Sequence, residues 1–408
     1  SKQGFIYLFD RSTGRPLFPL QERRYPTSDI PGEVTAATQS LPVKPEPFAR
    51  QALTEDMLTN RTPEARQWAL EQFRKFRNGG QFYPFAVGAD TILFPGFDGA
   101  AEWGGPAVDP NTGIIYVNSN EMAWTGALEE NKPESGPLGI YLSQCSVCHG
   151  DKMAGSPPAI PSLKSLAGRL APAEVAATIR NGKGRMPGFT NLTQDQVSAL
   201  VAFLIGGEKK EMTSTEEAPA AKYRFTGYNR FLDPDGYPAI APPWGTLNAI
   251  DLNTGKYVWK INLGEYPALA AKGMTNTGSD NYGGPIVTAG GLLFIGATSH
   301  DKKFRAFDKS TGKLLWETTL PFSGNATPIT YMVNGRQYVA IAAGGGKDFN
   351  SPSGGVYVAF ALPLDTLPAG RTDRANRDIR SRQQSNHVQS DQGHRISLRL
   401  SKTVRYVP

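Results

Sequence analysis

The segments NAIDLNTGKYVW (248–259) and RAFDKSTGKLLW (305–316) repeat one pattern, and this pattern decides the fold class. Each consists of a short apolar run, an Asp, two spacer residues, Thr-Gly and a second apolar run that ends in Trp. Because Asp caps tight turns and Gly adopts positive φ readily, each segment is predicted to form a β-hairpin. Two further segments follow the pattern closely, YLFDRSTGRPLF (7–18) and PAVDPNTGIIYV (106–117).

Repeated hairpins of this kind are typical of a β-propeller, and we expect one repeat per blade. The interval from Asp251 to Asp308 fits a single blade. The interval from Asp109 to Asp251 is much longer, and removing roughly eighty residues from it restores a near-normal repeat. The spacing therefore predicts a separate domain inserted between two blades.

The predicted insert contains both cysteines of the chain, in YLSQCSVCHGDKM (141–153). Cys145, Cys148 and His149 form the Cys-x-x-Cys-His attachment motif of c-type haem, in which two thioethers bind the porphyrin and the imidazole lies beneath the iron. A disulfide or a redox-active dithiol would also use two such cysteines. Zinc would need two more ligands, and the chain has no second Cys/His pair.

Haem iron of this type needs a second axial ligand, commonly His or Met. Met186 is the predicted ligand, because it lies in NGKGRMPGF (181–189), a loop punctuated by Gly and Pro. His300 lies in a polar turn, where we expect a surface role. After the loop, TQDQVSALVAFLIGG (193–207) has a capping-box start and apolar residues at helical spacing, so it is predicted to form an amphipathic helix.

The haem motif, GRMPGF and the closing helix together resemble a class I cytochrome c domain. The hairpin repeats, read with FPGFDGAAEWGGPAVDP (94–110), NYGGPIVTAGGLLFIGAT (281–298) and NATPITYMVNGRQYVAIAAGGG (325–346), resemble the quinoprotein dehydrogenases that use pyrroloquinoline quinone (PQQ). The likeness is strongest to the glucose dehydrogenase-like branch. The family fold is an eight-bladed propeller with PQQ on its axis. The resemblance thus implies a mainly β chain, about half of that propeller, with an inserted all-α cytochrome c domain.

Four regions are predicted on this basis. They are propeller blades in 1–130 and 213–365, the cytochrome c domain in 131–212, and a basic, disordered tail in 366–408. The resemblance is to the second half of the propeller. We therefore expect the family's catalytic aspartate and Ca²⁺ ligands to lie in a missing N-terminal half, and the fragment alone to be inactive.

Several positions match the family's PQQ site. Lys2 matches a basic residue that hydrogen-bonds the ortho-quinone oxygens, where negative charge builds up as the quinone accepts a hydride. Glu102 and Trp103 match a polar residue and a Trp near the cofactor, although many relatives have Asn at the first position. The plain alternatives are an exposed strand-edge lysine for Lys2 and a propeller-core role for Trp103.

Two other segments complete this match. Tyr282 corresponds to an aromatic residue near the cofactor, often Trp in relatives, and a core role is again the alternative. Gly344 and Gly345 belong to a glycine run (344–346) that lets the backbone approach the cofactor closely.

The net charge of +6 does not indicate a nucleic-acid partner. The tail from Thr366 onward carries nine Arg/Lys and three Asp/Glu, so the remaining chain has 34 residues of each sign. The tail also has almost no apolar periodicity, which is typical of disorder. With 44 Gly, 32 Pro and 39% hydrophobic residues, the rest is typical of a globular, turn-rich protein.

We therefore predict a periplasmic quinohaemoprotein dehydrogenase. It would oxidise an aldose or alcohol with PQQ and Ca²⁺ and pass electrons to haem c and then to a respiratory cytochrome or quinone. The sequence has no apolar run of about eighteen residues that would span a membrane. The alternative is a non-catalytic electron-transfer cytochrome on a β-propeller scaffold.

Overall fold

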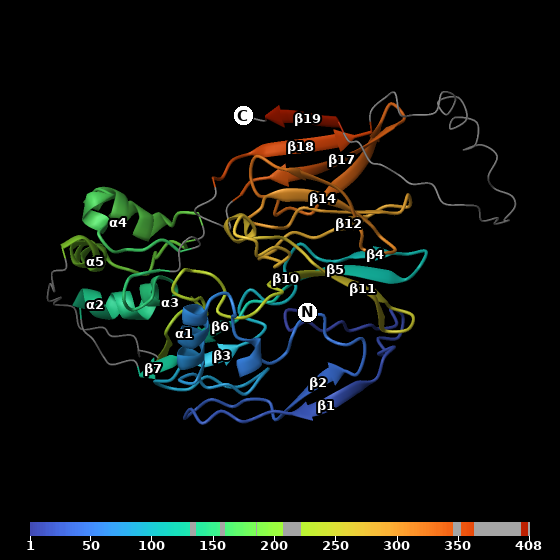
Figure 1. Cartoon of the computed structure of the whole chain (residues 1–408). Helices are drawn as coiled ribbons and strands as arrows, with labels where there is room; N and C mark the ends of the chain where they lie inside the picture. The colour runs from blue at the N-terminus through green and yellow to red at the C-terminus, as the bar shows by residue number, and fades with distance from the viewer. Residues whose placement is uncertain are drawn as a thin grey trace, which may run out of the picture.

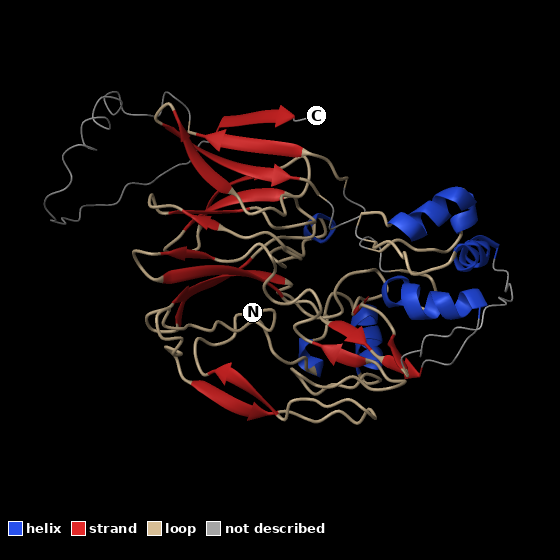
Figure 2. Cartoon of the chain, turned by 180° about the vertical axis from the view of Figure 1, so that it is seen from behind, coloured by secondary structure: helices blue, strands red, loops and turns tan. Residues whose placement is uncertain are grey.

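The structure is a computed structural model that describes residues 1–130, 136–155, 160–184, 186–206, 222–345, 352–362 and the backbone of 401–406. The chain is mainly β, and its principal sheets are stacked in chain order, as Figures 1 and 2 show. Helices of the insert lie along one side of this stack. The described sheets form an open stack rather than a closed ring, in agreement with the predicted partial propeller.

Three four-stranded antiparallel sheets form most of the stack. The first contains β4 (Ala107–Asp109), β5 (Ile114–Asn120), β10 (Gly245–Asp251) and β11 (Lys256–Asn262). The second contains β12 (Ile286–Val287), β13 (Leu292–Ile295), β14 (Lys303–Asp308) and β15 (Leu314–Thr319). The third contains β16 (Ile329–Val333), β17 (Arg336–Ala343), β18 (Val356–Ala361) and β19 (Ser401–Tyr406). A hairpin of β1 (Leu20–Arg24) and β2 (Thr38–Pro42) precedes them.

Strand β19 lies within the tail that was predicted to be disordered. It pairs with β18 along its whole length, so the prediction of disorder does not hold for Ser401–Tyr406. The tail residues 366–400 and 407–408 lie outside the described residues. Within the described part of the chain, no helix is long and apolar enough to cross a membrane.

The four Asp-x-x-Thr-Gly segments form the predicted turns. In each, a carboxylate oxygen of the Asp accepts the N–H of the residue two positions ahead, at 2.8–3.0 Å. The Gly N–H then donates to the Asp carbonyl at 2.7–2.9 Å. The glycine φ angles are 70° to 73°, a left-handed conformation that residues with a Cβ adopt at a cost.

The expectation of one repeat per blade is wrong. The Asp109 turn joins β4 to β5 and the Asp251 turn joins β10 to β11, and all four strands belong to one sheet. Strand β5 pairs with β10 from Gly245↔Asn120 to Asp251↔Ile114. The insertion therefore lies inside one blade, between its second and third strands, and not between two blades.

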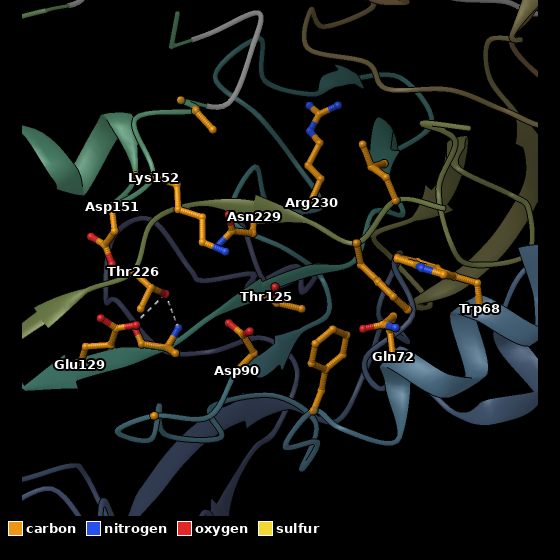
Figure 3. A pocket seen from close by; sticks show the side chains of 18 residues that line it. Trp68, Gln72, Asp90, Thr125, Glu129, Asp151, Lys152, Thr226, Asn229 and Arg230 are labelled. Carbon is orange, nitrogen blue, oxygen red and sulfur yellow. Dashed lines mark hydrogen bonds between the residues drawn. The ribbon is translucent and has the colours of Figure 1, made fainter. Parts of the chain in front are cut away.

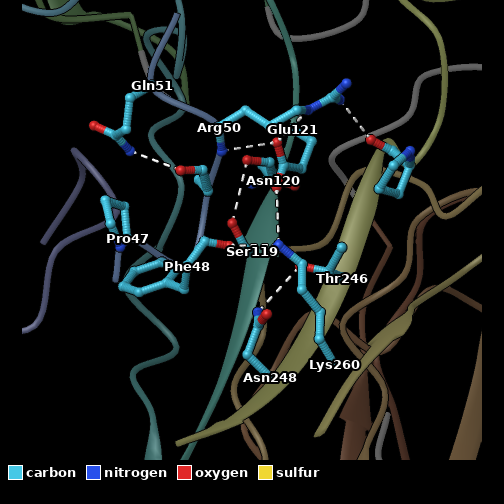
Figure 4. Close-up of polar contacts among 12 residues, drawn as sticks. Pro47, Phe48, Arg50, Gln51, Ser119, Asn120, Glu121, Thr246, Asn248 and Lys260 are labelled. Atoms are coloured by element: carbon cyan, nitrogen blue, oxygen red, sulfur yellow. Dashed lines mark hydrogen bonds and ion pairs between the residues drawn. The ribbon is translucent and has the colours of Figure 1, made fainter. Parts of the chain in front are cut away.

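The insertion leaves the blade and returns to it at one point. The N–H of Glu121, which follows β5, donates to the carbonyl of Trp244, which precedes β10, at 3.1 Å. Arg50 contacts both segments, because its Nε donates to Glu121 Oε2 at 2.9 Å and its Nη2 to the Pro243 carbonyl at 2.8 Å (Figure 4). The Glu121 side chain is 1% exposed, and Lys260 Nζ lies 3.7 Å from its second oxygen.

Four short strands, which we call the stalk, connect this point to the helices. Strand β6 (Trp124–Gly126) pairs with β9 (Asn229–Arg230), and β7 (Leu128–Glu130) pairs with β8 (Tyr223–Phe225). Strand β3 (Thr91–Leu93) adds to β6. An apolar cluster that includes residues of α1 (Pro63–Phe73) packs against this region. The short helix η1 (Glu55–Met57) precedes α1 in the chain.

Beyond the stalk the chain is helical. The elements are α2 (Gly136–Ile140), the π-helical turn η2 (Tyr141–Cys145), α3 (Ser146–His149), η3 (Leu166–Gly168), α4 (Pro172–Asn181) and α5 (Gln194–Gly206). The capping box before α5 is confirmed: Thr193 N–H donates to Gln196 Oε1 at 2.8 Å, and Gln196 N–H to Thr193 Oγ1 at 3.3 Å. Val197, Leu200 and other apolar residues of these helices share one buried cluster. The remaining short helix, α6 (Pro267–Ala270), lies between β11 and β12.

Candidate functional site

The haem-attachment motif lies at the helical end of the insert. Cys145 is buried and Cys148 is exposed, and no disulfide joins them. His149 is buried, and its Nδ1 lies 3.0 Å from the carbonyl oxygen of Pro161. An Nδ1–H that donates to this carbonyl fixes the tautomer and leaves Nε2 as the nitrogen available to a metal.

The protonation states around this motif favour haem over a redox dithiol. Burial, with the neighbouring Cys148 as a second cause, raises the pKa of Cys145 to about 11. A redox-active Cys-x-x-Cys pair needs an attacking thiol with a lowered pKa, and the environment of Cys145 does not provide one. Burial lowers the pKa of His149, despite the opposing effect of its hydrogen bond to the Pro161 carbonyl, and this favours the neutral imidazole that binds iron.

Met186 packs against the apolar cluster that contains Cys145. The loop that presents it is closed by paired backbone hydrogen bonds between Lys183 and Met186, at 3.0 and 3.1 Å. Met153 packs on the same cluster. The assignment of Met186 as the axial ligand therefore stays a prediction.

Other predicted residues lie in three loops that precede strands β4, β12 and β16 and in the two glycines that follow β17. We call this set of segments the inner-loop face. It comprises 97–105, 279–284, 323–327 and Gly344–Gly345. The loop containing Trp103 contacts the other two: Thr327 Oγ1 donates to the Gly104 carbonyl at 2.8 Å, and a Cβ on Gly284 would collide with the carbonyl oxygens of Gly104 and Gly105. Gly345 N–H donates to the Ser323 carbonyl at 3.0 Å.

Lys2 lies against the same face. Its Nζ donates to the carbonyl of Phe97 at 3.1 Å, and its carbonyl accepts the N–H of Ala100 at 2.7 Å. Gly99, with φ of 80°, allows this approach, because a Cβ there would lie 2.7 Å from Lys2 Cγ. Trp103 is 65% exposed, and Glu102 is half-buried beside it. Direct contacts thus connect Lys2 to the loop that carries Glu102 and Trp103, and residues 323–327 connect that loop to Gly345.

Tyr282 differs from these residues because its ring is 1% exposed and lies beneath the face. Its hydroxyl donates to Asp98 Oδ2 at 3.1 Å and accepts from Arg230 Nη2 at 2.8 Å. Burial, followed by the charge of Asp280, raises the pKa of Tyr282 well above its ordinary value, so the phenol stays protonated. Arg230 also pairs with Asp280 at 2.7 Å and with Asp98 at 3.1 Å.

Arg230 belongs to stalk strand β9, so this ion cluster connects the stalk to the inner-loop face. Its guanidinium carbon lies 5.1 Å from the ring centroid of Trp124 in β6. The predicted surface position of His300 holds only in part: its side chain is 23% exposed, stacks on Tyr266 with ring centroids 4.1 Å apart and lies 3.9 Å from Asp280. Sequence reasoning missed Arg230, because its partners lie 50 or more residues away and no local pattern marks it.

A cavity of about 790 Å³ separates the stalk from the loop that follows the haem motif. Figure 3 shows side chains entering it from three directions: Asp151 and Lys152 from the haem-motif loop, Trp68 and Gln72 from α1, and stalk residues between them. Asp90 lines it as well, and burial raises the pKa of this carboxyl. Arg230 is part of the lining, so one residue contacts both the cavity and the ion cluster.

The family described as "Glucose/ethanol/alcohol dehydrogenase, beta-propeller domain" (PQQ) matches residues 1–144 and 183–339. The chain belongs to this family. The quinoprotein chain also matches, over residues 136–204, the family described as "Cytochrome C oxidase, cbb3-type, subunit III". The second match covers the described helices of the insert up to residue 204 in α5.

Curated relatives of the quinoprotein chain are dehydrogenases. The quinoprotein glucose dehydrogenase of Escherichia coli (strain K12) is 30% identical over 380 residues, covering 90% of this chain and 38% of that protein. The glycerol dehydrogenase large subunit of Gluconobacter thailandicus is 29% identical over 375 residues, covering 89% and 42%. A quinohaemoprotein alcohol dehydrogenase from Comamonas testosteroni superposes with a TM-score of 0.40 at 17% identity, covering 88% of this chain and 34% of that one. The chain spans about two fifths of the length of these curated relatives.

The residues present fit the two cofactors that these families imply. For haem, two thiols, a correctly oriented imidazole and an apolar cluster occur together. For PQQ, the inner-loop face offers the Lys2 amine and the exposed Trp103 ring, on which a planar cofactor can stack. Calcium is different: in the described part of the chain no three acidic, His or Cys side chains converge on a point.

Proposed function

We propose that the protein is a quinohaemoprotein dehydrogenase that oxidises an aldose or alcohol with PQQ and transfers the electrons to its own haem c. Membership of the quinoprotein family supports the first half of this proposal. The observation that carries the second half is the Cys145–His149 motif inside a blade of the propeller. A respiratory cytochrome or quinone would then accept the electrons. Covalent haem attachment and PQQ use both favour the periplasm.

The proposed haem unit spans 131–212. Cys145 and Cys148 would form the thioethers, and His149 Nε2 and Met186 Sδ would bind the iron, which exchanges single electrons with its surroundings. The Pro161 carbonyl orients His149, and the apolar cluster that contains Cys145 would exclude water from the porphyrin. Haem attachment can be tested by expressing the chain with cytochrome c maturation machinery and staining a denaturing gel for haem. Cys145→Ser and Cys148→Ser should together abolish the stain.

The proposed PQQ site is the inner-loop face. PQQ, when bound, accepts a hydride equivalent from the substrate. Lys2 Nζ would donate a hydrogen bond to the quinone oxygens, and a fixed cation at this point stabilises the charge that develops there. Glu102, Trp103, Gly344 and Gly345 would line the cofactor, and the buried Tyr282 would support the face from beneath through Asp98.

PQQ binding can be measured by quenching of tryptophan fluorescence. Trp103→Phe should remove most of the quenching, because this ring is 65% exposed on the face. Trp316→Phe is the matched control, since this ring packs in the cluster between the last two sheets. Equal quenching in wild type and Trp103→Phe would place PQQ elsewhere.

The substrate panel should contain aldoses, polyols, primary alcohols and cyclic hydroxy acids, because the relatives are named for glucose, glycerol and quinate. The assay is dye reduction by the protein at the full length of its curated relatives, supplied with PQQ and Ca²⁺, because residues 1–408 alone are expected to be inactive. If no member of the panel reduces dye, while haem remains attached and reducible, the electron-transfer cytochrome on a scaffold is the better description.

A further inference from the structure

The contact between the cytochrome helices and the stalk is sparse. Besides the large cavity, a second one of about 180 Å³ opens between residues 142–147 of the insert and strand β8. These two cavities leave part of the contact surface without packed side chains to fix its geometry. The few polar contacts across it therefore determine how the haem motif lies relative to the propeller.

Arg224 makes the polar contact that crosses this surface. Its Nη1 donates to Asp151 Oδ1 of the haem-motif loop in a short hydrogen bond, and its Nη2 donates to Glu129 Oε2 at 2.5 Å. Glu129 and Arg224 are directly paired in the register of β7 and β8. Between described residues, Arg224–Asp151 is the one ion pair that joins the cytochrome helices to the rest of the chain.

The contact is sheltered from solvent. The Arg224 side chain is 16% exposed and that of Asp151 is 26% exposed. Ion pairs that are partly buried and directly hydrogen-bonded are stronger than exposed pairs, and salt screens them less completely. The smaller cavity also contains Arg224 in its lining, so this side chain lies at the boundary of that gap.

Asp151 is rigidly connected to the haem ligand. It follows His149 by two residues, in a loop closed by a hydrogen bond from Gly155 N–H to the His149 carbonyl at 2.7 Å. Tyr141, fully buried in the insert, donates its hydroxyl to the Gly150 carbonyl at 2.6 Å. A displacement of Asp151 therefore moves His149 with it.

We propose that Arg224 is a positioning residue that docks the haem-motif loop onto the stalk and so sets the distance between haem and the inner-loop face. Strands β8 and β9 continue from Arg224 to Arg230, which contacts Asp98, Asp280 and Tyr282 under that face. The docking geometry can be measured on the haem-loaded chain without PQQ or substrate. Its effect on electron transfer rests on the proposed function.

The test compares wild type, Arg224→Gln, Asp151→Asn and the double variant, each loaded with haem. Arg180→Gln is the matched control, because Arg180 contacts Gln194 within the cytochrome helices. Small-angle X-ray scattering in 50 mM and 1 M NaCl reports docking without PQQ or substrate. Removing a charge-assisted hydrogen bond should lower the equilibrium constant for docking by about tenfold or more.

We expect Arg224→Gln and Asp151→Asn to show the same enlarged radius of gyration at low salt, with no further change in the double variant. Wild type and Arg180→Gln should stay compact at both salt concentrations, because the Debye length of about 3 Å at 1 M leaves a partly buried, directly hydrogen-bonded pair largely unscreened. Haem absorption and the thermal midpoint of the helices should match in all variants. Equal radii in wild type and Arg224→Gln would overturn the docking role.

The second readout compares two rates, that of haem reduction by substrate and that of dye reduction by substrate. Arg224→Gln should slow haem reduction about tenfold or more while dye reduction is unchanged, because the dye takes electrons directly from the quinone site. If neither rate exists in wild type at the full length of the curated relatives, the proposed function fails and the scattering result still decides the docking role. Unchanged haem reduction in an expanded variant would refute the link between docking and electron transfer.

Discussion

Arg230 offers the sharpest stability prediction. It neutralises Asp280, whose side chain is 4% exposed, and it contacts Asp98 and Tyr282 from the stalk. Arg230→Met keeps much of the side-chain volume but removes the cation. The Asp280 carboxylate would then remain buried without its guanidinium partner.

The expected loss is about 3–5 kcal/mol of the free energy of unfolding, the usual cost of removing one partner of a buried ion pair. Asp98, with a side chain 19% exposed, can recover part of its solvation from water, so Asp280 should account for most of the loss. Adding Asp280→Asn to Arg230→Met removes the uncompensated charge and should recover more than half of the loss.

The assay is urea unfolding monitored by tryptophan fluorescence, with the haem signal recorded separately so that the insert and the propeller are distinguished. Arg230→Met alone and Asp280→Asn alone complete a double-mutant cycle. A loss below about 1 kcal/mol in Arg230→Met, as for an exposed pair, would refute the reasoning. So would a double variant as unstable as Arg230→Met.

Three further predictions follow from the packing and the ionisable groups. Met186→Ala should abolish the Met-to-iron absorption band of the oxidised protein, and an unchanged band would assign the ligand to another residue. Gly284→Ala should lower the thermal midpoint of the stacked sheets markedly, because the new Cβ would collide with the carbonyl oxygens of Gly104 and Gly105. Gly355→Ala is the control and should change the midpoint little, since a Cβ there has open space around it. Burial raises the pKa of Asp90, so its stabilising contribution is present at low pH and is lost as pH rises through that pKa. The stability of wild type relative to Asp90→Asn should therefore fall from acid to neutral pH in thermal melts, and a constant difference would contradict this.

Local chemistry in the sequence predicted local structure well. The turns at Asp10, Asp109, Asp251 and Asp308 depend on an Asp and a Gly within five residues, and all four formed as expected. The capping box before α5 is equally local. Pairing between distant strands is different, because nothing in residues 114–120 specifies β10 as the neighbour of β5. For that reason the insertion was placed between blades rather than inside one.

The candidate site shows the same division. The haem motif is contiguous and could be recognised directly, and the resemblance to quinoproteins indicated Lys2 and Trp103. Arg230 could not be found in this way, because its role comes from carboxylates that folding brings to it from two separate loops. The Arg224–Asp151 contact likewise depends on how the insert lies against the stalk, which sequence spacing does not encode.

The most direct test of the central claim is anaerobic reduction of the haem by substrate, followed by stopped-flow absorption. The protein is used at the full length of its curated relatives and is supplied with PQQ and Ca²⁺. We predict that an oxidisable aldose, polyol or alcohol reduces the haem stoichiometrically without added mediator. Lys2→Ala should slow this reduction by about 10²–10³-fold, as does removal of one donor to a developing oxyanion. Haem that stays oxidised while the same substrate reduces an added dye would contradict internal electron transfer from PQQ to haem.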